Sequence, residues 1–281
     1  MSMSILNNIS SLETQNQMST TSANLQNVLE QLSSGSRLSS GADDPAGLAI
    51  ANGLQANTTA LTQSAMNASD GVGKLQVADG ALSQVTTLLN TAVTLATEAS
   101  NGTVSSAQQA SMDNEFSAIK AEITRIGAST TYNGAQVFSG VKSQVFISDG
   151  TAAGSSTIDA TVGTLSASSI GFSASTPTNL AADSLTSVAS AEAALTDITT
   201  AIANVSGDRA TVGADMNRLQ SATNVVNTQV QNLTSAYDNI SSANIAQDVS
   251  LMSQYNILQS TGMAALQQSN QSQQAILKLL Q

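Results

Sequence analysis

The chain of 281 residues contains no histidine and no cysteine. These absences exclude imidazole bases, thiol nucleophiles, the Ser-His triad and the usual zinc ligands. No disulfide can hold the fold together. The carboxylates that remain are spread along expected helices without a visible pocket, among them Asp43, Asp44, Asp70, Asp79, Asp113 and Glu115. We therefore expect neither an enzyme nor a cofactor or metal site.

Charge and aromatic residues are also scarce. Charged residues make up 10% of the chain, aromatic residues make up 2%, and tryptophan is absent. Aromatic side chains supply much of the buried area of thick globular cores, so a core of Ala, Leu, Val, Ile and Thr favours slender helical layers. The net charge of −11, with only eight Lys and Arg in all, argues against nucleic-acid binding.

Long apolar runs are missing as well. No run of ~18 apolar residues exists, so no membrane insertion is expected. The first residues, "MSMSILNNISSLETQNQM", lack the basic and apolar regions of a secretory signal peptide.

What is present is helical periodicity at both ends. Apolar residues at steps of three and four predict a helix over about 5–32, and a similar pattern predicts a last helix from about 249 to the end. The polar faces of both carry Asn, Gln, Ser and Thr almost without charge. An ordinary surface helix is one interpretation. Charged residues are depleted at buried contacts between proteins, so the scarcity of charge on these faces favours burial against copies of the same chain.

The segment Leu32 to Leu54 interrupts this pattern with four glycines and one of the two prolines of the chain. Asp44 can cap a new helix and Pro45 fits its first turn. The pair Asp43-Asp44 could instead suggest a hard-cation site. We prefer the cap, because such sites need six or more oxygen ligands. A near-heptad stripe then predicts a helix over 45–99, which Asn101-Gly102 ends.

The middle of the chain continues with a third expected helix, about 105–128, and a turn at Asn133-Gly134. Residues 136–176 are rich in Ser and Gly, with β-prone runs at 137–138 and 144–147 and a turn near 149–150, which predicts one or two β-hairpins. A heptad pattern follows from 195 to 240, with Arg209 at one seam position, and breaks at Ser241-Ser242.

The order of elements is therefore symmetrical: terminal helix, break, long helix, β insert, long helix, break, terminal helix. We expect a mostly α fold, a long antiparallel helical coiled-coil bundle with a small β-hairpin insert. The two terminal helices carry apolar stripes with little in one chain to cover them. Since apolar area gains ~25 cal/mol per Å² on burial, other copies of the chain are the expected cover.

At this point the residues resemble a known family. The opening "SILNNISSLETQNQMSTTSANLQNVLEQLSSGSRLSSGADDPAGLAIANGL" is similar to the N-terminus of bacterial flagellins, and "VQNLTSAYDNISSANIAQDVS" with the residues after it is similar to the C-terminus. The internal stretches "DGALSQVTTLLNTAVTLATEASNGT" and "TRIGASTTYNGAQVF" agree. The resemblance covers 4–140 and 180–281 and is that of a short form without large outer domains.

The resemblance implies a structural subunit that is exported unfolded by the flagellar type III apparatus and self-assembles into the filament used for motility. It implies a secreted protein in the extracellular bacterial flagellum. The implied partners are other copies of the chain as a helical homopolymer, the flagellar cap and hook-junction proteins, the export apparatus, and an export chaperone on the C-terminal helix.

The resemblance also implies a domain layout. Residues 1–42 and 242–281 would form the inner coiled-coil domain D0, with a connecting spoke at about 33–54. Residues 43–136 and 177–241 would form the helical core of domain D1, and 137–176 its β-hairpin insert.

Candidate functional residues follow from the pattern and the resemblance together. The D0 assembly seam comprises Ile5, Ile9, Leu12, Leu25, Leu29, Leu32, Met252, Tyr255, Leu258, Leu266, Ile276 and Leu280. The spoke comprises Gly35, Arg37, Gly41, Asp44 and Pro45. We expect Gly35 and Gly41 to take positive φ or close backbone approaches, so that Gly41→Val would impair assembly.

The innate-immune receptor that binds flagellin, a Toll-like receptor, reads an Arg, a Leu and a Glu in the family. These positions correspond to Thr91, Leu95 and Glu115 here, so the Arg is absent. We therefore expect weak receptor activation, because a charge-assisted contact is lost.

Three other functions compete with that of a filament subunit. A hook–filament junction protein shares flagellin-like termini, and the compact insert favours the filament subunit over it. Flagellins with proteolytic inserts need His and Glu zinc ligands, which the absence of His excludes. A generic intracellular coiled-coil scaffold would carry charged positions beside its seam, and this chain is poor in charge.

Overall fold

The computed structural model describes residues 8–148, 157–172 and 177–279. Its backbone contacts divide the chain into two units, residues 1–56 with 232–281 (unit 1) and residues 57–231 (unit 2). The five helices of the described residues are α1 (Ile9–Ser34), α2 (Pro45–Ala99), α3 (Ser106–Ser129), α4 (Val188–Ser241) and α5 (Ile245–Leu279). The four short strands are β1 (Thr131–Tyr132), β2 (Ala135–Gln136), β3 (Ser143–Phe146) and β4 (Thr157–Ala160). The expected mostly α fold with small antiparallel strand pairs is confirmed.

The helix boundaries follow local capping chemistry. Asp44 accepts a hydrogen bond from the Gly47 N–H at 2.9 Å, so the expected cap of α2 is confirmed, and Pro45 is its first residue. The helix begins and ends at 45 and 99, the bounds that the sequence predicts. α3 starts with a reciprocal capping box between Ser105 and Gln108.

In unit 2, α2 and α4 run antiparallel. Arg209 on α4 bonds to Asp79 on α2, with Nε–Oδ1 at 2.8 Å and Nη2–Oδ2 at 3.3 Å. A Cβ at Gly71 would lie 3.2 Å from Leu219 Cδ1. Residue numbers therefore rise along one helix as they fall along the other. Arg209, the charged residue at the heptad seam of α4, is thus paired with Asp79 on the opposite helix. The hydrogen bond to Asp79 raises the pKa of the Arg209 guanidinium.

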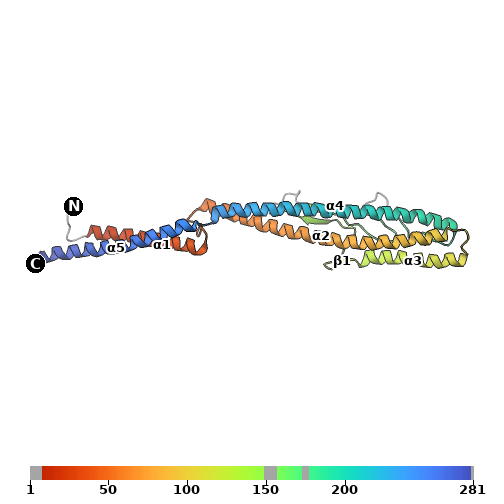
Figure 1. Ribbon diagram of the computed structural model, residues 1–281, viewed down its shortest axis with the longest axis horizontal. Helices are drawn as coiled ribbons and strands as arrows, with labels where there is room; N and C mark the ends of the chain where they lie inside the picture. Colours follow the sequence, from red (N-terminus) through yellow and green to blue (C-terminus); the bar gives the residue numbers. More distant parts are fainter. Residues whose placement is uncertain (1–7, 149–156, 173–176, 280–281) are drawn as a thin grey trace. The chain divides into compact units, whose positions relative to one another are not determined.

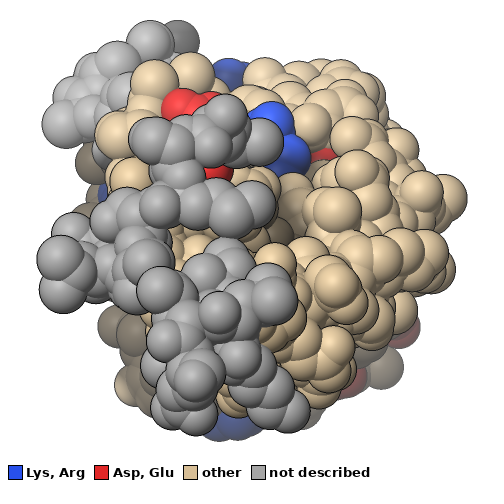
Figure 2. All heavy atoms as spheres, turned by 90° about the vertical axis from the view of Figure 1, so that its left-hand side faces the viewer, with Lys and Arg blue, Asp and Glu red and all other residues tan. Residues whose placement is uncertain are grey.

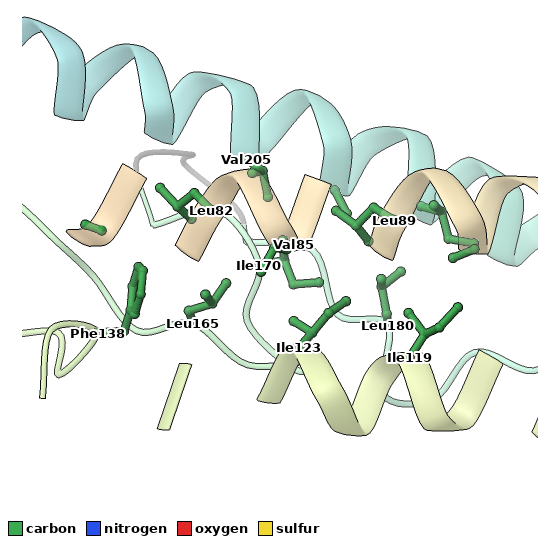
Figure 3. Packing of buried hydrophobic residues seen from close by; sticks show 14 of the residues in the cluster. Leu82, Val85, Leu89, Ile119, Ile123, Phe138, Leu165, Ile170, Leu180 and Val205 are labelled. Carbon is green, nitrogen blue, oxygen red and sulfur yellow. The ribbon is translucent and has the colours of Figure 1, made fainter. Parts of the chain in front are cut away.

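The core of unit 2 lies between α2, α3, α4 and the insert. In Figure 3, Ile119 and Ile123 of α3 point toward α2, and Leu82, Val85 and Leu89 of α2 belong to the same buried cluster. Side chains of the insert and of the segment that follows it fill the space between these helices, among them Phe138, Leu165, Ile170 and Leu180. The largest fully buried side chains include one aromatic ring, Phe116, so aliphatic residues make up most of this core.

Two antiparallel strand pairs follow α3, the first just before the insert and the second within it. β1 pairs with β2 through the turn at Asn133-Gly134, which the sequence predicts, and both turn residues have positive φ, 51° and 76°. β3 pairs with β4, Val145 opposite Ile158. The expectation of a strand at 137–138 is wrong, because Val137 and Phe138 lie in a turn with their side chains buried in the core. The turn expected near 149–150 lies outside the described residues.

Polar side chains on the helices bind the backbone of the insert and of the segment that follows it. Leu185 N–H donates to Asp113 of α3 at 2.7 Å, and Phe172 N–H donates to Asp208 of α4 at 3.0 Å. Ser64 Oγ of α2 donates to the Ser148 carbonyl at 2.8 Å, and the Ser148 N–H donates back to it at 3.0 Å. Backbone groups that lack strand partners are thereby satisfied.

Candidate assembly surface

Unit 1 consists of the helix pair α1 and α5 together with the adjoining ends of α2 and α4 (Figure 1). The two helices run antiparallel. Ser269 bonds to Asn8 at 3.2 Å, and a Cβ at Gly262 would lie 3.9 Å from Met18. An isolated bridge joins Ser36 to Ser242 at the other end of the pair. The residues of the predicted assembly seam that the structure describes lie on this pair.

The inner face of the pair has heptad spacing on both helices. Its α1 positions are less exposed than their neighbours and recur at steps of three and four: Ser11, Thr14, Met18, Thr21, Leu25, Val28 and Leu32. The matching α5 positions are Asp248, Met252, Tyr255, Gln259, Gly262, Leu266, Ser269 and Gln273. Polar and small residues occupy about half of these positions, so the contact between α1 and α5 buries little apolar area.

Outside the inner face, both helices carry exposed apolar side chains on several sides. On α1, Ile9 is 68% exposed, Leu12 is 60% exposed, and Leu29 is 45% exposed. On α5, the exposed apolar residues are Ile245, Val249, Ile257, Leu258 and Met263. Exposed apolar residues concentrated on paired helices indicate a contact surface more strongly than single exposed residues do.

Charge is sparse over the same surface. No Asp, Glu, Lys or Arg lies between Glu13 and Glu30 on α1, or between Asp248 and Lys278 on α5. Figure 2, which faces the ends of these helices, shows uncharged residues over most of the described atoms. Charge depletion is typical of the buried centre of a protein–protein interface.

The structure therefore divides the predicted seam residues into two groups. The inner face holds the half-buried residues Leu25, Leu32, Met252, Tyr255 and Leu266. Outside it lie the exposed residues Ile9, Leu12, Leu29 and Leu258. Ile5 and Leu280 lie outside the described residues, and the side chain of Ile276 is not described.

The sequence prediction missed the exposed Ile257. A usable signal was present: Ile257 and Leu258 are adjacent apolar residues, and adjacent residues on a helix lie ~100° apart. They cannot both face the same neighbour.

The spoke residues bind the junction of α4 and α5, and we call these contacts the clasp. Arg37 donates to the Ile240 carbonyl through Nε at 3.3 Å and through Nη2 at 2.9 Å. Arg37 N–H donates to the Ser241 carbonyl at 2.7 Å, and Ala243 N–H donates to the Gly35 carbonyl at 3.0 Å. A cation on the last carbonyls of α4 suits the negative end of the helix dipole.

The two spoke glycines differ. Gly35 ends α1 at φ 67°, so the expectation of positive φ is confirmed there. The expectation for Gly41 is wrong: its φ is not positive, and the nearest atom to a built Cβ is Leu48 Cδ2 at an ordinary 3.8 Å. The structure gives no steric reason for Gly41→Val to impair assembly. Asp43 closes the turn instead, accepting from the N–H groups of Ser39 and Ser40.

The described residues offer neither a metal site nor a membrane-spanning helix. No group of three or more Asp or Glu could hold a metal ion there. None of the helices in the described part has a stretch long and apolar enough to cross a membrane.

Comparison with known proteins agrees with this picture. Residues 5–143 match the bacterial flagellin N-terminal helical region, and residues 195–280 match the bacterial flagellin C-terminal helical region. A flagellin of Halalkalibacterium halodurans is 33% identical over 91% of both chains. A flagellin of Listeria monocytogenes is 32% identical over 99% of both chains.

A solved structure shares the fold. The putative flagellar hook-associated protein from Vibrio parahaemolyticus is 17% identical, with a TM-score of 0.58, over 71% of this chain and all of that one. At that identity the likeness concerns the fold alone. The family matches and the near full-length relatives decide the assignment. The chain belongs to the bacterial flagellin family and is a structural subunit of the extracellular flagellar filament, not an enzyme.

Proposed function

We propose that the exposed sides of α1 and α5, outside their inner face, are the surface through which neighbouring subunits join in the filament. The observation that carries this proposal is the set of exposed apolar side chains on two helices whose faces are nearly free of charge. The inner face cannot supply much stability, because it is half polar. Contact with other copies would bury the apolar area that a single chain leaves in water.

The domain layout is part of the same proposal. Residues 1–42 and 242–281 form D0, and residues 43–136 and 177–241 form D1, with 137–176 as its β-hairpin insert. The proposed boundaries fall at helix ends, whereas the contact units meet inside α2 and α4. The spoke at 33–54 is the connection between α1 and α2. The clasp supports this proposal, because Arg37 binds the spoke to the end of α4.

Sedimentation of polymers after seeding tests the assembly surface. Leu12→Ser removes an exposed apolar side chain, and burial of a leucine contributes roughly 1.5–3 kcal/mol. The critical concentration for assembly should therefore rise about tenfold or more. Gln15→Ser, at an exposed polar position of the same helix, is the matched control and should leave it unchanged. Unaltered assembly by Leu12→Ser, seen as normal tubes in negative stain, would refute the proposal.

The remaining partners rest on family membership. We propose export of the unfolded chain through the type III apparatus, a chaperone that covers the C-terminal helix before export, and contacts with the cap and hook-junction proteins at the filament ends. The exposed apolar residues of α5 support a chaperone role, because they would otherwise face water before assembly.

We also propose weak activation of the flagellin-binding Toll-like receptor. Thr91 and Glu115 are exposed and Leu95 is half-buried, but no Lys or Arg lies between Lys74 and Lys120. Purified monomer should give a weak response in receptor-reporter cells, and Thr91→Arg should strengthen it. A potent response from the unaltered protein would contradict this proposal.

A further inference from the structure

Three Asn-Gly dipeptides occur in the chain, at 52–53, 101–102 and 133–134. In such a pair the backbone nitrogen of glycine can attack the asparagine side-chain carbon Cγ, because no Cβ on glycine hinders the approach. Whether it does depends on the freedom of that nitrogen and on the position of the side chain. The three pairs lie in three different settings.

Two settings hold the peptide in place. Asn52-Gly53 lies inside α2, where the helix fixes the backbone. Asn133-Gly134 joins β1 to β2 with both residues in the left-handed region, and the strand pairs Tyr132–Ala135 and Thr131–Gln136 fix the turn from both sides.

The third setting aligns the reacting groups. Asn101 follows the last turn of α2, and its Oδ1 accepts hydrogen bonds from Thr103 N–H at 3.2 Å and from Thr103 Oγ1 at 3.0 Å. The first of these bonds closes a ring of atoms that contains both Asn101 Cγ and Gly102 N. The Gly102 N–H has no hydrogen-bond acceptor among the described residues, and nothing lies within 4 Å of a Cβ built on Gly102. Both residues are exposed to water.

We propose that Asn101 is a site of spontaneous deamidation that Thr103 accelerates. Gly102 N loses its proton and forms a bond to Asn101 Cγ, and the side-chain amide leaves as ammonia, which gives a cyclic succinimide. Water then opens the ring at either carbonyl, to aspartate or to isoaspartate. One water molecule is consumed and one ammonia is released, with no change of oxidation state.

The role of Thr103 follows from charge. When the nitrogen attacks, negative charge develops on Oδ1, and two donors already point at that atom. Donors placed before the reaction stabilise such a charge without having to reorganise. The site is exposed, so the effect is that of an ordinary hydrogen bond and not that of a buried oxyanion hole.

The product changes the turn between α2 and α3. It places a new carboxylate just past the C-terminal end of α2, where the helix dipole is already negative and where Glu98 lies one turn back. Isoaspartate also lengthens the backbone inside the turn that the Val104 N–H closes onto the Asn101 carbonyl at 3.0 Å. The fraction of subunits with aspartate or isoaspartate at this turn would increase with time after synthesis.

The test is peptide mass spectrometry of the full chain during incubation in mildly alkaline buffer, with isoaspartyl methyltransferase labelling of the product. Asn101 should convert faster than Asn52 and Asn133 in the same molecules. Thr103→Val should slow conversion at Asn101 by about two- to tenfold, whereas Thr103→Ser, which keeps the hydroxyl, should retain the rate. Gly102→Ala should slow it further.

Incubation in denaturant is the control for local sequence effects. There the hydrogen bonds to Oδ1 are lost, so Thr103→Val and the unaltered chain should convert at equal rates. Three results would overturn the proposal: native conversion at Asn133 that matches Asn101, a native rate that Thr103→Val leaves unchanged, or a Thr103→Val effect that persists in denaturant.

Discussion

Gly127 offers a sharp test of how α3 packs against the insert. A Cβ on this buried residue would lie 1.8 Å from the backbone oxygen of Leu165 and 2.8 Å from its carbonyl carbon. The neighbouring backbone has little room to move, because Ala167 N–H donates to Thr124 of α3 at 3.1 Å and Gln136 Nε2 donates to the Gly127 carbonyl at 3.0 Å. Gly127→Ala must therefore displace one of these elements.

The expected magnitude combines two opposing effects. Alanine improves the helix by about 0.8–1 kcal/mol relative to glycine. Overpacking in a well-ordered core costs typically 1–3 kcal/mol, and a backbone atom as the obstacle places this case at the upper end. Gly127→Ala should thus lower the free energy of unfolding by about 1–2 kcal/mol.

Gly207→Ala is the matched control. Gly207 lies in α4 with nothing within 4 Å of a built Cβ, so only the helix effect applies and the variant should gain about 0.8–1 kcal/mol. Urea unfolding of the full chain, followed by circular dichroism at equal protein concentration, measures both variants. If Gly127→Ala proved as stable as Gly207→Ala, the close approach of α3 and the insert would be refuted.

Two further changes probe charged and polar contacts. Burial raises the pKa of Asp183, with Asp197 adding to the rise and Lys120 opposing it, and its Oδ2 is buried without a hydrogen-bond partner. The folded state then binds the proton more tightly, so the contribution of the protonated carboxyl to stability is present at acid pH and is lost as pH rises through the folded pKa. In urea unfolding, Asp183→Asn should therefore stabilise the chain at neutral pH and not at acid pH. A gain of equal size at both pH values would contradict the argument. Arg37→Ala should loosen the clasp by about 1–2 kcal/mol, and hydrogen exchange should show faster exchange at Ala243 N–H, while unchanged protection there would mean that Arg37 does not hold the crossing.

The sequence predicted the parts of the fold that rest on local chemistry. Pro45 begins α2, and Asn101-Gly102 follows its end. Asn133-Gly134 is the preferred dipeptide of a two-residue hairpin. The antiparallel pairing of α2 and α4 followed from two long apolar stripes joined by an insert. In each case the evidence in the sequence was a local motif or the spacing of apolar residues within one helix.

The failures involve contacts between distant segments. Gly41 looked like Gly35 in sequence, but only the helix end at Gly35 required a left-handed residue. Val137 and Phe138 have strand propensity, yet their burial against the helices decided their conformation. Asp113 could not be identified as the acceptor for the Leu185 N–H, because nothing local distinguishes it from an exposed helix residue.

The predicted assembly seam combines residues that the structure places on different sides of α1 and α5. A heptad stripe is visible when its residues are apolar, whereas the inner face of α1 and α5 is half polar. The apolar residues of these different sides were therefore merged into one seam. Helix geometry alone, at ~100° per residue, puts Leu12 about 140° away from Leu25, and the prediction overlooked this difference.

The acceptors of Arg37 carry a consequence for the order of folding. They are main-chain carbonyls at positions 240 and 241, so almost any residues there could serve, but they belong to a part of the chain synthesised some two hundred positions later. This contact cannot nucleate anything, since closing so long a loop early has a large entropic cost. The crossing at Arg37 can therefore form only after the chain as far as position 241 is available.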